Sequence, residues 1–368
     1  MKRTLALLLA VLLLLLPCAS VPVSAGAPGT SARAAFLMEA GGAVLYEKNA
    51  DERLPMASTT KIMTALVALD CLDPDALVTV PPEACGVEGS SVYLSPGEKL
   101  TARDLLAAVL LESANDAAAA LAFAAAGGIE PFAELMNEKA AQLGLMSTHF
   151  VNPHGLDDEE HYTTARDLAR LTAEALRNDL FRSLVGMKNA VIERDGPGPR
   201  ALINHNRLLR MSEDVIGVKT GYTKRSGRCL VSAAQKDGVL LIAVTLSDPD
   251  DWDDHLALHA YGFSRCRRVI LAEAGEIVLR VPCAGAPDGF VTASNPSALS
   301  LCLTDSPALS RVIEGERLLF APVEKGTRIG VVTFYADGKP VASLPLLAAE
   351  SIPAPEEKSF FGFFRRTR

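Results

Sequence analysis

Short apolar runs joined by glycine-containing turns stand near both ends of the first two thirds of the chain. Residues 34–37 and 43–46 form one such pair, and residues 228–235 and 239–246 form the other. Two β-rich runs around a turn of this kind predict a hairpin. We therefore expect one antiparallel hairpin near each end of this region.

Helical periodicity fills the segment between the two hairpins. Residues 62–69 are apolar nearly all round, which predicts a buried helix. Thr101 and Asp104 have the form of a capping box and begin a predicted helix to about Leu111. Three further predicted helices cover 117–126, 131–143 and 164–177. Helices between terminal hairpins predict an α+β domain on an antiparallel sheet.

The N-terminus has the pattern of a secretory signal peptide. Lys2 and Arg3 precede a run that is almost wholly apolar from Leu5 to Leu16, and small residues follow to Ala25. A basic start, a short apolar run and a small-x-small site are typical of a cleaved leader, and the run is too short for a spanning helix. We expect an exported protein that begins after Ala25.

A second, all-β domain is predicted after about Cys266. Short β-rich runs at 276–281, 317–320 and 330–335 alternate with turn residues, which is typical of a small all-β domain. It should end near Ile352, where prolines follow. The predicted organisation is a leader, two domains and a tail: residues 1–25, 26–266, 267–352 and 353–368.

Charge and cysteine content exclude some classes of function. Without the leader the chain has 34 basic and 44 acidic residues, a net charge of −10 instead of −8. This argues against nucleic-acid binding, which depends on basic surfaces. The six cysteines after the leader are too sparse for a disulfide scaffold and form no Cys-x-x-Cys pair. Cys71 and Cys85 are the best candidate pair, although buried free thiols are the favoured interpretation.

Ser58 and Lys61 stand three residues apart at the start of the first predicted helix, so their side chains share one face. A serine hydroxyl needs a base within hydrogen-bond reach to act as a nucleophile. Lysine can be that base when burial and the helix N-terminus lower its pKa. The alternative is a serine cap beside a solvated lysine.

Ser113-Ala114-Asn115 lies at the junction of two predicted helices. A hydroxyl and an amide at this place could relay a proton and hold a substrate amide. The alternative is structural, because Ser113 and Asp116 also have the spacing of a capping box.

Lys219-Thr220-Gly221 is predicted to lie in a strand before the second hairpin. The lysine offers a charge for a carboxylate, the threonine offers a hydroxyl, and the glycine lets another backbone come close. The alternative is an exposed edge strand, which also favours lysine.

The three motifs together are those of penicillin-binding proteins and class A β-lactamases. The chain resembles the D-alanyl-D-alanine carboxypeptidases, the low-molecular-weight, serine-type penicillin-binding proteins. This implies an α+β, β-lactamase/transpeptidase-like domain (an antiparallel sheet with helices) followed by a small all-β domain. Five further segments share the likeness: residues 55–57, 88–91, 152–156, 161–162 and 204–209.

The resemblance implies acyl transfer without a metal or cofactor. Ser58 would attack the carbonyl between the two terminal D-alanines of a peptidoglycan stem peptide, and Lys61 would take its proton. Ser113 would pass that proton to the leaving D-alanine. Water would then release the shortened peptide, and β-lactams would trap Ser58 by mimicking the substrate.

The resemblance also implies five substrate-binding residues: Asn115, Lys219, Thr220, Gly221 and Tyr222. Asn115 would hold the peptide amide, and Lys219 with Thr220 would bind the terminal carboxylate. Backbone N–H groups of Ser58 and Tyr222 would form the oxyanion hole. Tyr222 stands where some family members carry histidine, which we expect to tune the site and leave its chemistry intact.

Other functions stay open. A β-lactamase, transpeptidase or endopeptidase could use the same triad, although the Glu-x-x-x-Asn signature of class A β-lactamases is absent after Ser113. A catalytically silent wall-binding protein could keep the fold. His255 and His259, beside several aspartates, suggest a metal site, but without His-Glu-x-x-His we interpret them as part of a surface helix after an acidic loop.

The C-terminal tail is a candidate membrane anchor. Four of the 13 phenylalanines fall within residues 360–364, beside basic residues. So short a segment cannot span a bilayer but can lie at its surface, where cations add attraction to anionic lipids. The protein would then lie on the outer face of the cytoplasmic membrane or at the cell wall. The alternative is a tail that packs on the protein or stays disordered.

Overall fold

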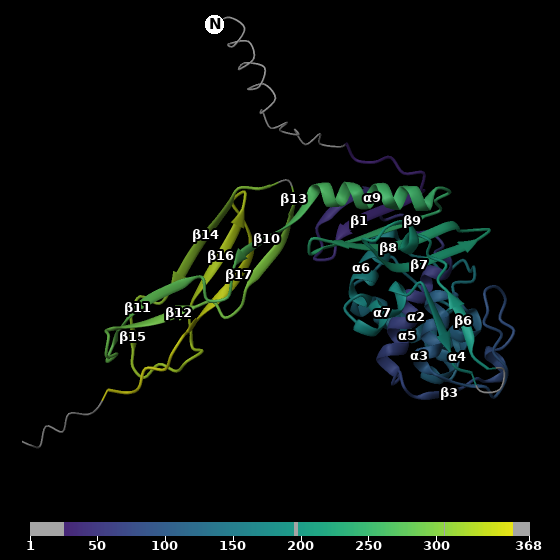
Figure 1. Ribbon diagram of the computed structural model, residues 1–368, viewed down its shortest axis with the longest axis horizontal. Coiled ribbons are helices and arrows are strands. Elements are labelled where there is room, and N and C mark those ends of the chain that lie inside the picture. Colours follow the sequence, from purple (N-terminus) through teal and green to yellow (C-terminus); the bar gives the residue numbers. More distant parts are fainter. Residues whose placement is uncertain (1–25, 195–197, 305, 356–368) are drawn as a thin grey trace, which may run out of the picture.

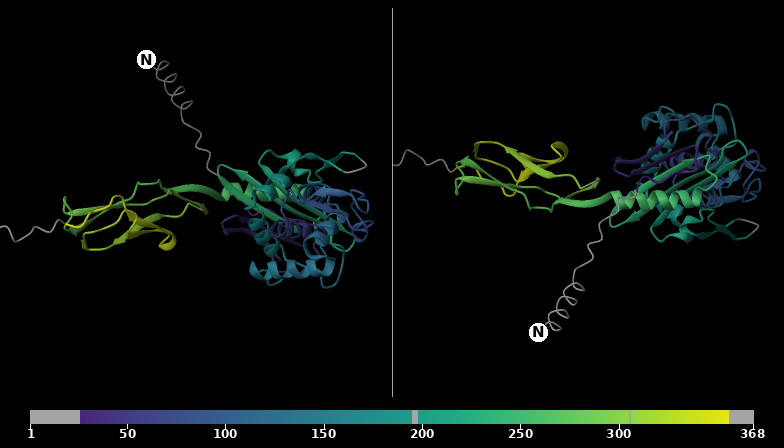
Figure 2. Two further views of the ribbon diagram at one scale, coloured as in Figure 1. Left: turned by 90° about the horizontal axis from the view of Figure 1, so that it is seen from below. Right: turned by 90° about the horizontal axis from the view of Figure 1, so that it is seen from above.

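The computed structural model describes residues 26–194, 198–304 and 306–355, and it contains two domains (Figure 1). The first combines a sheet with helices, and the second is built of strands. They follow one another along an elongated molecule, and the chain passes between them from α9 (Asp251–Arg265) into β10 (Cys266–Ala272) (Figure 2). The expected fold class is confirmed.

A five-stranded antiparallel sheet in the order β2-β1-β9-β8-β7 forms the centre of the first domain. Both predicted hairpins are present, as β1–β2 and β8–β9. The pairing of β1 with β9 brings the beginning and the end of the domain together. The strands are β1 (Ala34–Glu39), β2 (Val44–Lys48), β7 (Val215–Thr223), β8 (Gly227–Lys236) and β9 (Val239–Leu246).

Helices cover both faces of this sheet (Figure 1). On one face, α9 packs along β9, β8 and β1, and α8 (Leu208–Met211) packs on β7. On the other face, α6 (Ala165–Ala175) packs on β9 and β1, and α7 (Asp179–Gly186) packs on β7. This layer also contains α2 (Lys61–Cys71) and the helices α3 (Ala102–Leu111), α4 (Asn115–Ala126) and α5 (Ile129–Gln142).

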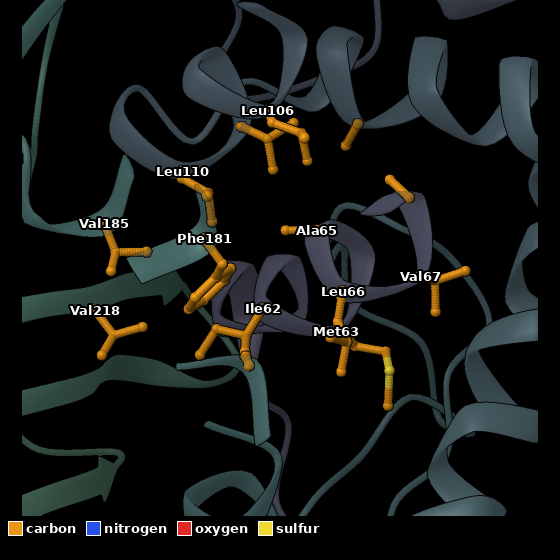
Figure 3. Close-up of a cluster of buried hydrophobic side chains, with 14 of the residues drawn as sticks. Ile62, Met63, Ala65, Leu66, Val67, Leu106, Leu110, Phe181, Val185 and Val218 are labelled. Carbon is orange, nitrogen blue, oxygen red and sulfur yellow. The ribbon is translucent and has the colours of Figure 1, made fainter. Parts of the chain in front are cut away.

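The predicted all-round apolar helix, α2 (Lys61–Cys71), lies inside this helical layer. Figure 3 shows Ile62, Leu66 and their neighbours among side chains from other elements, with Phe181 of α7 and Val218 of β7 close by. The 3-10 turn η1 (Ala57–Thr60) precedes α2. Neither η1 nor α2 has a side-chain N-cap, so the interpretation of Ser58 as a serine cap is wrong.

Two small hairpins lie at the margins of the helical layer. Strand β3 (Leu77–Thr79) pairs with β4 (Lys99–Thr101), and β5 (Asn189–Ile192) pairs with β6 (Arg200–Ile203). A 3-10 turn, η2 (Pro82–Ala84), follows β3. Thr101 accepts a hydrogen bond from the Asp104 N–H, which confirms the predicted cap of α3.

The second domain is a six-stranded sheet in the order β14-β16-β17-β12-β11-β15, with a separate β10–β13 pair. Its own core includes Val291, Val332 and Leu346. The strands after β10 are β11 (Val278–Ala284), β12 (Phe290–Ser294), β13 (Leu299–Thr304), β14 (Leu309–Gly315), β15 (Leu319–Phe320), β16 (Arg328–Ala336) and β17 (Lys339–Ala348).

The candidate pair Cys71–Cys85 is wrong, and the favoured interpretation of free thiols is correct for these two cysteines. The disulfide joins Cys266 to Cys302 across the β10–β13 pair, with their Cα atoms 6.1 Å apart. Cys71 is exposed and Cys85 half-buried, so the expectation that their thiols are buried is wrong. It is correct for Cys229 and Cys283. The pairing of strands far apart in sequence, rather than a short loop, brings the bonded cysteines together.

The predicted leader and nearly all of the predicted tail lie outside the described residues. Within residues 26–355, apart from the short gaps, no single helix is long and apolar enough to cross a membrane. α4 and α5 reach that length only as a pair bent by 82°, and α4 is largely buried in the core.

Candidate active site

Ser58 lies on η1, one turn before Lys61. The Lys61 Nζ atom is 3.0 Å from Ser58 Oγ, which is hydrogen-bond distance. Nζ also lies 2.6 Å from Asn115 Oδ1 and 2.5 Å from the His154 carbonyl oxygen. These oxygen atoms hold the lysine against the serine, as the nucleophile and base of an acyl-transfer site require.

Lys61 is fully buried. Burial lowers the pKa of its ammonium group well below the ordinary value, and the nearby charge of Lys219 lowers it further. The Asp116 carboxylate acts in the opposite direction and is the weaker influence. A lysine in this environment can lose its proton and act as a base. The interpretation of Lys61 as a solvated lysine is wrong.

Ser113 and Asn115 lie at the junction of α3 and α4, as predicted. Ser113 has a left-handed backbone with φ of 61°, and Asn115 is the first residue of α4. Asn115 Nδ2 donates to the Glu88 carbonyl oxygen. The N-cap position of α4 is Ala114, so the capping-box interpretation of this motif is wrong.

Asp116 has a different structural role. Its carboxylate accepts hydrogen bonds from the Ser91 hydroxyl and from the backbone N–H groups of Val92 and Leu94. The side chain therefore fixes the loop over residues 91–94, which continues the segment 88–91 that shares the resemblance.

Lys219 and Thr220 lie on β7, the strand predicted for them. Lys219 is only 1% exposed and donates from Nζ to the Thr220 carbonyl oxygen. Burial lowers the pKa of its ammonium group to about 7. An exposed edge-strand lysine is therefore ruled out here, while a role for Lys219 in binding a carboxylate stays a prediction.

Gly221 allows β7 to approach the nucleophile. A Cβ atom at this position would lie 3.1 Å from the backbone nitrogens of Ser58 and Thr59 and from the Met56 carbonyl oxygen. This is the close backbone contact for which a strand glycine is suited. Tyr222, the next residue, is 65% exposed.

A cleft of about 320 Å³ joins these elements. Five predicted residues line it, whereas Lys61, Asn115 and Lys219 lie behind its wall. The lining residues are Ser58, Ser90, Ser113, His205, Thr220, Gly221, Tyr222, Arg228, Asp251 and Trp252. A larger and more open groove beside α6 and α7 contains none of the motif residues.

Sequence reasoning missed Arg228, Asp251 and Trp252. Arg228 pairs with Tyr222 across β7 and β8, and Arg228 Nη2 bonds Asp251 Oδ1 at 2.8 Å. The hairpin register was the available signal for Arg228, because residues opposite each other on paired strands share a face. No comparable signal marks the beginning of α9.

The segment over residues 152–156 packs against the nucleophile turn. Gly155 has φ of 86°, and a Cβ atom there would lie 2.0 Å from the Ala57 carbonyl oxygen. His161 Nε2 lies 2.7 Å from Thr60 Oγ1. Burial is the main cause that lowers the pKa of His154 to about 3 and that of His161 to about 4, so both rings are neutral near pH 7.

His255 and His259 belong to the buried interior. His255 Nδ1 and His259 Nε2 each lie 2.6 Å from Ser232 Oγ, between α9 and β8. Their expected place on a surface helix is therefore wrong for these two side chains. Among the described residues, no group of three or more His, Cys, Asp or Glu is arranged to hold a metal ion.

Comparison with known families gives two matches along the chain. Residues 21–250 match the family described as D-alanyl-D-alanine carboxypeptidase. Residues 273–354 match the family described as penicillin-binding protein 5, C-terminal domain. The first match covers the first domain up to the beginning of α9, and the second covers most of the second domain.

Individual relatives are similar over most of the chain. The D-alanyl-D-alanine carboxypeptidase DacF of Bacillus subtilis is 33% identical, covering 100% of this chain and 98% of its own. DacC of Escherichia coli is 35% identical, covering 91% and 87%. Penicillin-binding protein 5 of Haemophilus influenzae has a structure that superposes with a TM-score of 0.72 at 28% identity, covering 89% of this chain and 99% of its own.

The Streptomyces K15 DD-transpeptidase superposes with a TM-score of 0.62 at 34% identity. It covers 65% of this chain and 100% of its own. Two thirds of the present chain therefore correspond to the whole of that enzyme.

Proposed function

The chain belongs to the D-alanyl-D-alanine carboxypeptidase family of serine-type, low-molecular-weight penicillin-binding proteins, and we propose that Ser58 is the nucleophile with which it removes the terminal D-alanine of peptidoglycan stem peptides. The observation that carries this proposal is the 3.0 Å separation of Ser58 Oγ from Lys61 Nζ, a nitrogen that is fully buried.

The first step is acylation of Ser58. Neutral Lys61 accepts the hydroxyl proton as Oγ bonds to the carbonyl carbon between the two D-alanines. Asn115 Oδ1 and the His154 carbonyl oxygen, both near Nζ, stabilise the lysinium that forms. A base positioned in this way typically contributes about 10²–10⁴-fold to a rate.

The carbonyl oxygen becomes negatively charged in this step and requires hydrogen-bond donors close to it. Gly221 brings β7 against the backbone N–H of Ser58, so that this N–H and that of Tyr222 can form the pair. Each such donor is worth about 2.7–4 kcal/mol in related chemistry. Ser113, at the cleft wall, passes the proton to the amine of the leaving D-alanine as the C–N bond breaks.

Water then attacks the acyl-enzyme and restores Ser58. The shortened peptide leaves with a free carboxylate. A β-lactam follows the first step, but its ring opens without a leaving group departing, so the acyl group stays on Ser58 for longer. A transpeptidase would use an amine in place of this water, and it shares all earlier steps.

Mass spectrometry tests the assignment of the nucleophile. Treatment with penicillin should add one acyl group, on the peptide that contains Ser58, and Ser58→Ala should carry none. A cell-wall pentapeptide should lose one D-alanine with the wild-type protein. An adduct elsewhere would refute the role of Ser58, and rapid turnover of the penicillin would favour a β-lactamase.

We propose in addition that the protein is exported and held at the outer face of the cytoplasmic membrane by its C-terminal tail, residues 353–368. The apolar and basic composition of that segment supports this. A chain ending at Pro355 should keep carboxypeptidase activity but no longer sediment with anionic liposomes. Equal sedimentation of both forms would contradict the anchor.

A further inference from the structure

We propose that an apolar patch at the end of the second domain contacts the lipid surface of the membrane, in addition to the C-terminal tail. The patch, which we call the β15 patch, consists of Pro282, Ala284, Leu318 and Phe320. The proposal rests on the membrane attachment proposed above and gives the folded second domain a part in it.

The β15 patch is one outward-facing surface. Strand β15 pairs with β11 in parallel, and Ala284 lies opposite Phe320. The preceding pair, Cys283 and Leu319, packs on the core of the second domain. Because successive side chains of a strand point to opposite faces, Ala284 and Phe320 point away from that core.

The β15 patch is also strongly exposed. Phe320 is 70% exposed and Leu318 is 51% exposed. Pro282 and Ala284 are exposed as well. A single exposed apolar side chain is common on soluble proteins, but several on one face typically mark a contact with a membrane or with another molecule. The patch therefore has the composition of a contact surface.

The chain leaves the second domain beside this patch. A Cβ atom at Gly285 would lie 3.2 Å from the Ala321 Cβ and 3.3 Å from the Pro355 Cγ. Gly285 and Ala321 directly follow the two patch residues Ala284 and Phe320, and Pro355 is the last described residue. Figure 1 shows β15 at the end of the second domain that lies farthest from the first domain.

The tail limits how far the β15 patch can be from the bilayer. Phe360 follows Pro355 by five residues, and five residues span at most about 18 Å when fully extended. With the phenylalanines of the tail at the lipid interface, Pro355 stands within that distance of it. The adjoining patch can then enter the interface, where its apolar side chains leave water. This proximity favours lipid over a second copy of the chain as the occupant.

The β15 patch contact is apolar in origin. The charged residues that adjoin the patch in sequence are three acids and two bases, with a sum of −1: Asp288, Glu316, Glu324, Arg317 and Lys325. They give no net attraction to an anionic surface. That attraction comes from the four basic residues of the tail, which outnumber its two glutamates. Salt should therefore weaken the tail contact and leave the patch contact unchanged.

Sedimentation with liposomes of phosphatidylcholine and phosphatidylglycerol tests the patch in the chain from Gly26 to Arg368. The double variant Leu318→Ser/Phe320→Ser should lower the partition coefficient by about 5–20-fold although the tail is intact. This factor should be the same at low and high salt. Val312→Ser is the matched control and should bind like the wild type, because Val312 is 47% exposed on β14, at the opposite edge of the same sheet.

Tryptophan quenching by brominated lipids gives a direct readout that needs no loss of binding. Phe320→Trp keeps the patch apolar, and its added fluorescence should be quenched on brominated liposomes. Trp252 is the one native tryptophan and lines the cleft of the first domain, so the wild type gives the background. Val312→Trp should add no quenched fluorescence.

Three results would overturn the proposal. One is an unchanged partition coefficient in the double variant, and another is unquenched added fluorescence in membrane-bound Phe320→Trp. The third is a lower molar mass of the lipid-free double variant than of the lipid-free wild type, which would make the patch an interface between two copies. Unchanged acylation by penicillin shows that the variants are folded.

The tail and the β15 patch can fail separately. If a chain ending at Pro355 still sediments and loses this binding on the double substitution, the tail fails as the anchor and the patch stands. If removal of the tail abolishes binding and the double substitution in the full chain has no effect, the tail stands and the patch fails.

Discussion

Gly155→Ala should damage the active site more than the fold. Gly155 has φ of 86°, and a Cβ atom would lie 2.0 Å from the Ala57 carbonyl oxygen and 2.9 Å from Thr60 Oγ1. A left-handed backbone costs an alanine about 1–2 kcal/mol, and an overpacked contact costs about 1–3 kcal/mol more. The expected loss in the free energy of unfolding is therefore about 2–5 kcal/mol, against a typical total of about 5–15 kcal/mol.

The direction of relaxation decides the effect on activity. The atom in conflict belongs to the backbone of Ala57, which directly precedes Ser58, so relief of the contact moves the nucleophile. A displacement of about 1 Å in a reacting group can cost about 10²-fold in rate. We expect the rate constant of acylation by a fluorescent penicillin to fall by this order in folded Gly155→Ala protein.

Gly97→Ala separates the two causes. Gly97 has φ of 81° but no heavy atom within 4 Å of the position of a Cβ, so its variant carries the backbone cost alone. Denaturant unfolding should show a loss of about 1–2 kcal/mol, with acylation unchanged. Equal effects of the two substitutions on stability and on acylation would refute the reasoning.

Two further predictions concern buried ionisable groups. Lys61→Arg keeps a cation that cannot lose its proton, so the rate of acylation should fall by about 10²–10⁴-fold. The control Lys139→Arg, at the surface ion pair with Asp70, should be acylated at the normal rate. A similar rate in both variants would exclude Lys61 as the base. Burial lowers the pKa of His259 to about 4, below the value near 6.5 that it has in the unfolded chain. Between these two pH values the unfolded chain therefore binds more protons than the folded one. The free energy of unfolding should fall as the pH drops from about 6.5 to 4. His259→Gln should reduce that fall by up to about 3 kcal/mol in denaturant titrations at pH 7 and 4.5, and an unchanged pH dependence would contradict it.

Local patterns predicted most of the secondary structure. The β1–β2 and β8–β9 hairpins, the cap at Thr101 and the buried helix after Ser58 each depend on residues close in sequence. Such features follow from turn chemistry and periodicity. The pairing of β1 with β9 does not, because nothing in either strand specifies a partner some 200 residues away.

The site was predicted only where its residues lie close together in the sequence. Ser58, Lys61 and Ser113 belong to motifs with fixed spacing, which the sequence displays directly. Burial is a tertiary property, so Lys219 could be read equally well as an exposed edge residue or as a ligand-binding cation. Arg228 reads as a polar residue at the start of a β-rich run. Only strand register and the packing of α9 bring it to the cleft.

The position of β7 at the margin of the sheet has a consequence for how much substrate variety the enzyme tolerates. Among the described residues, β7 has a strand neighbour on one side only, β8, so its outer backbone N–H and C=O groups are available to an extended peptide that adds as a further strand. Such pairing reads the main chain and its chirality and is indifferent to most side chains. The end of the peptide would then be recognised strictly while residues farther from the scissile bond could differ, so that one enzyme could process stem peptides of varied composition.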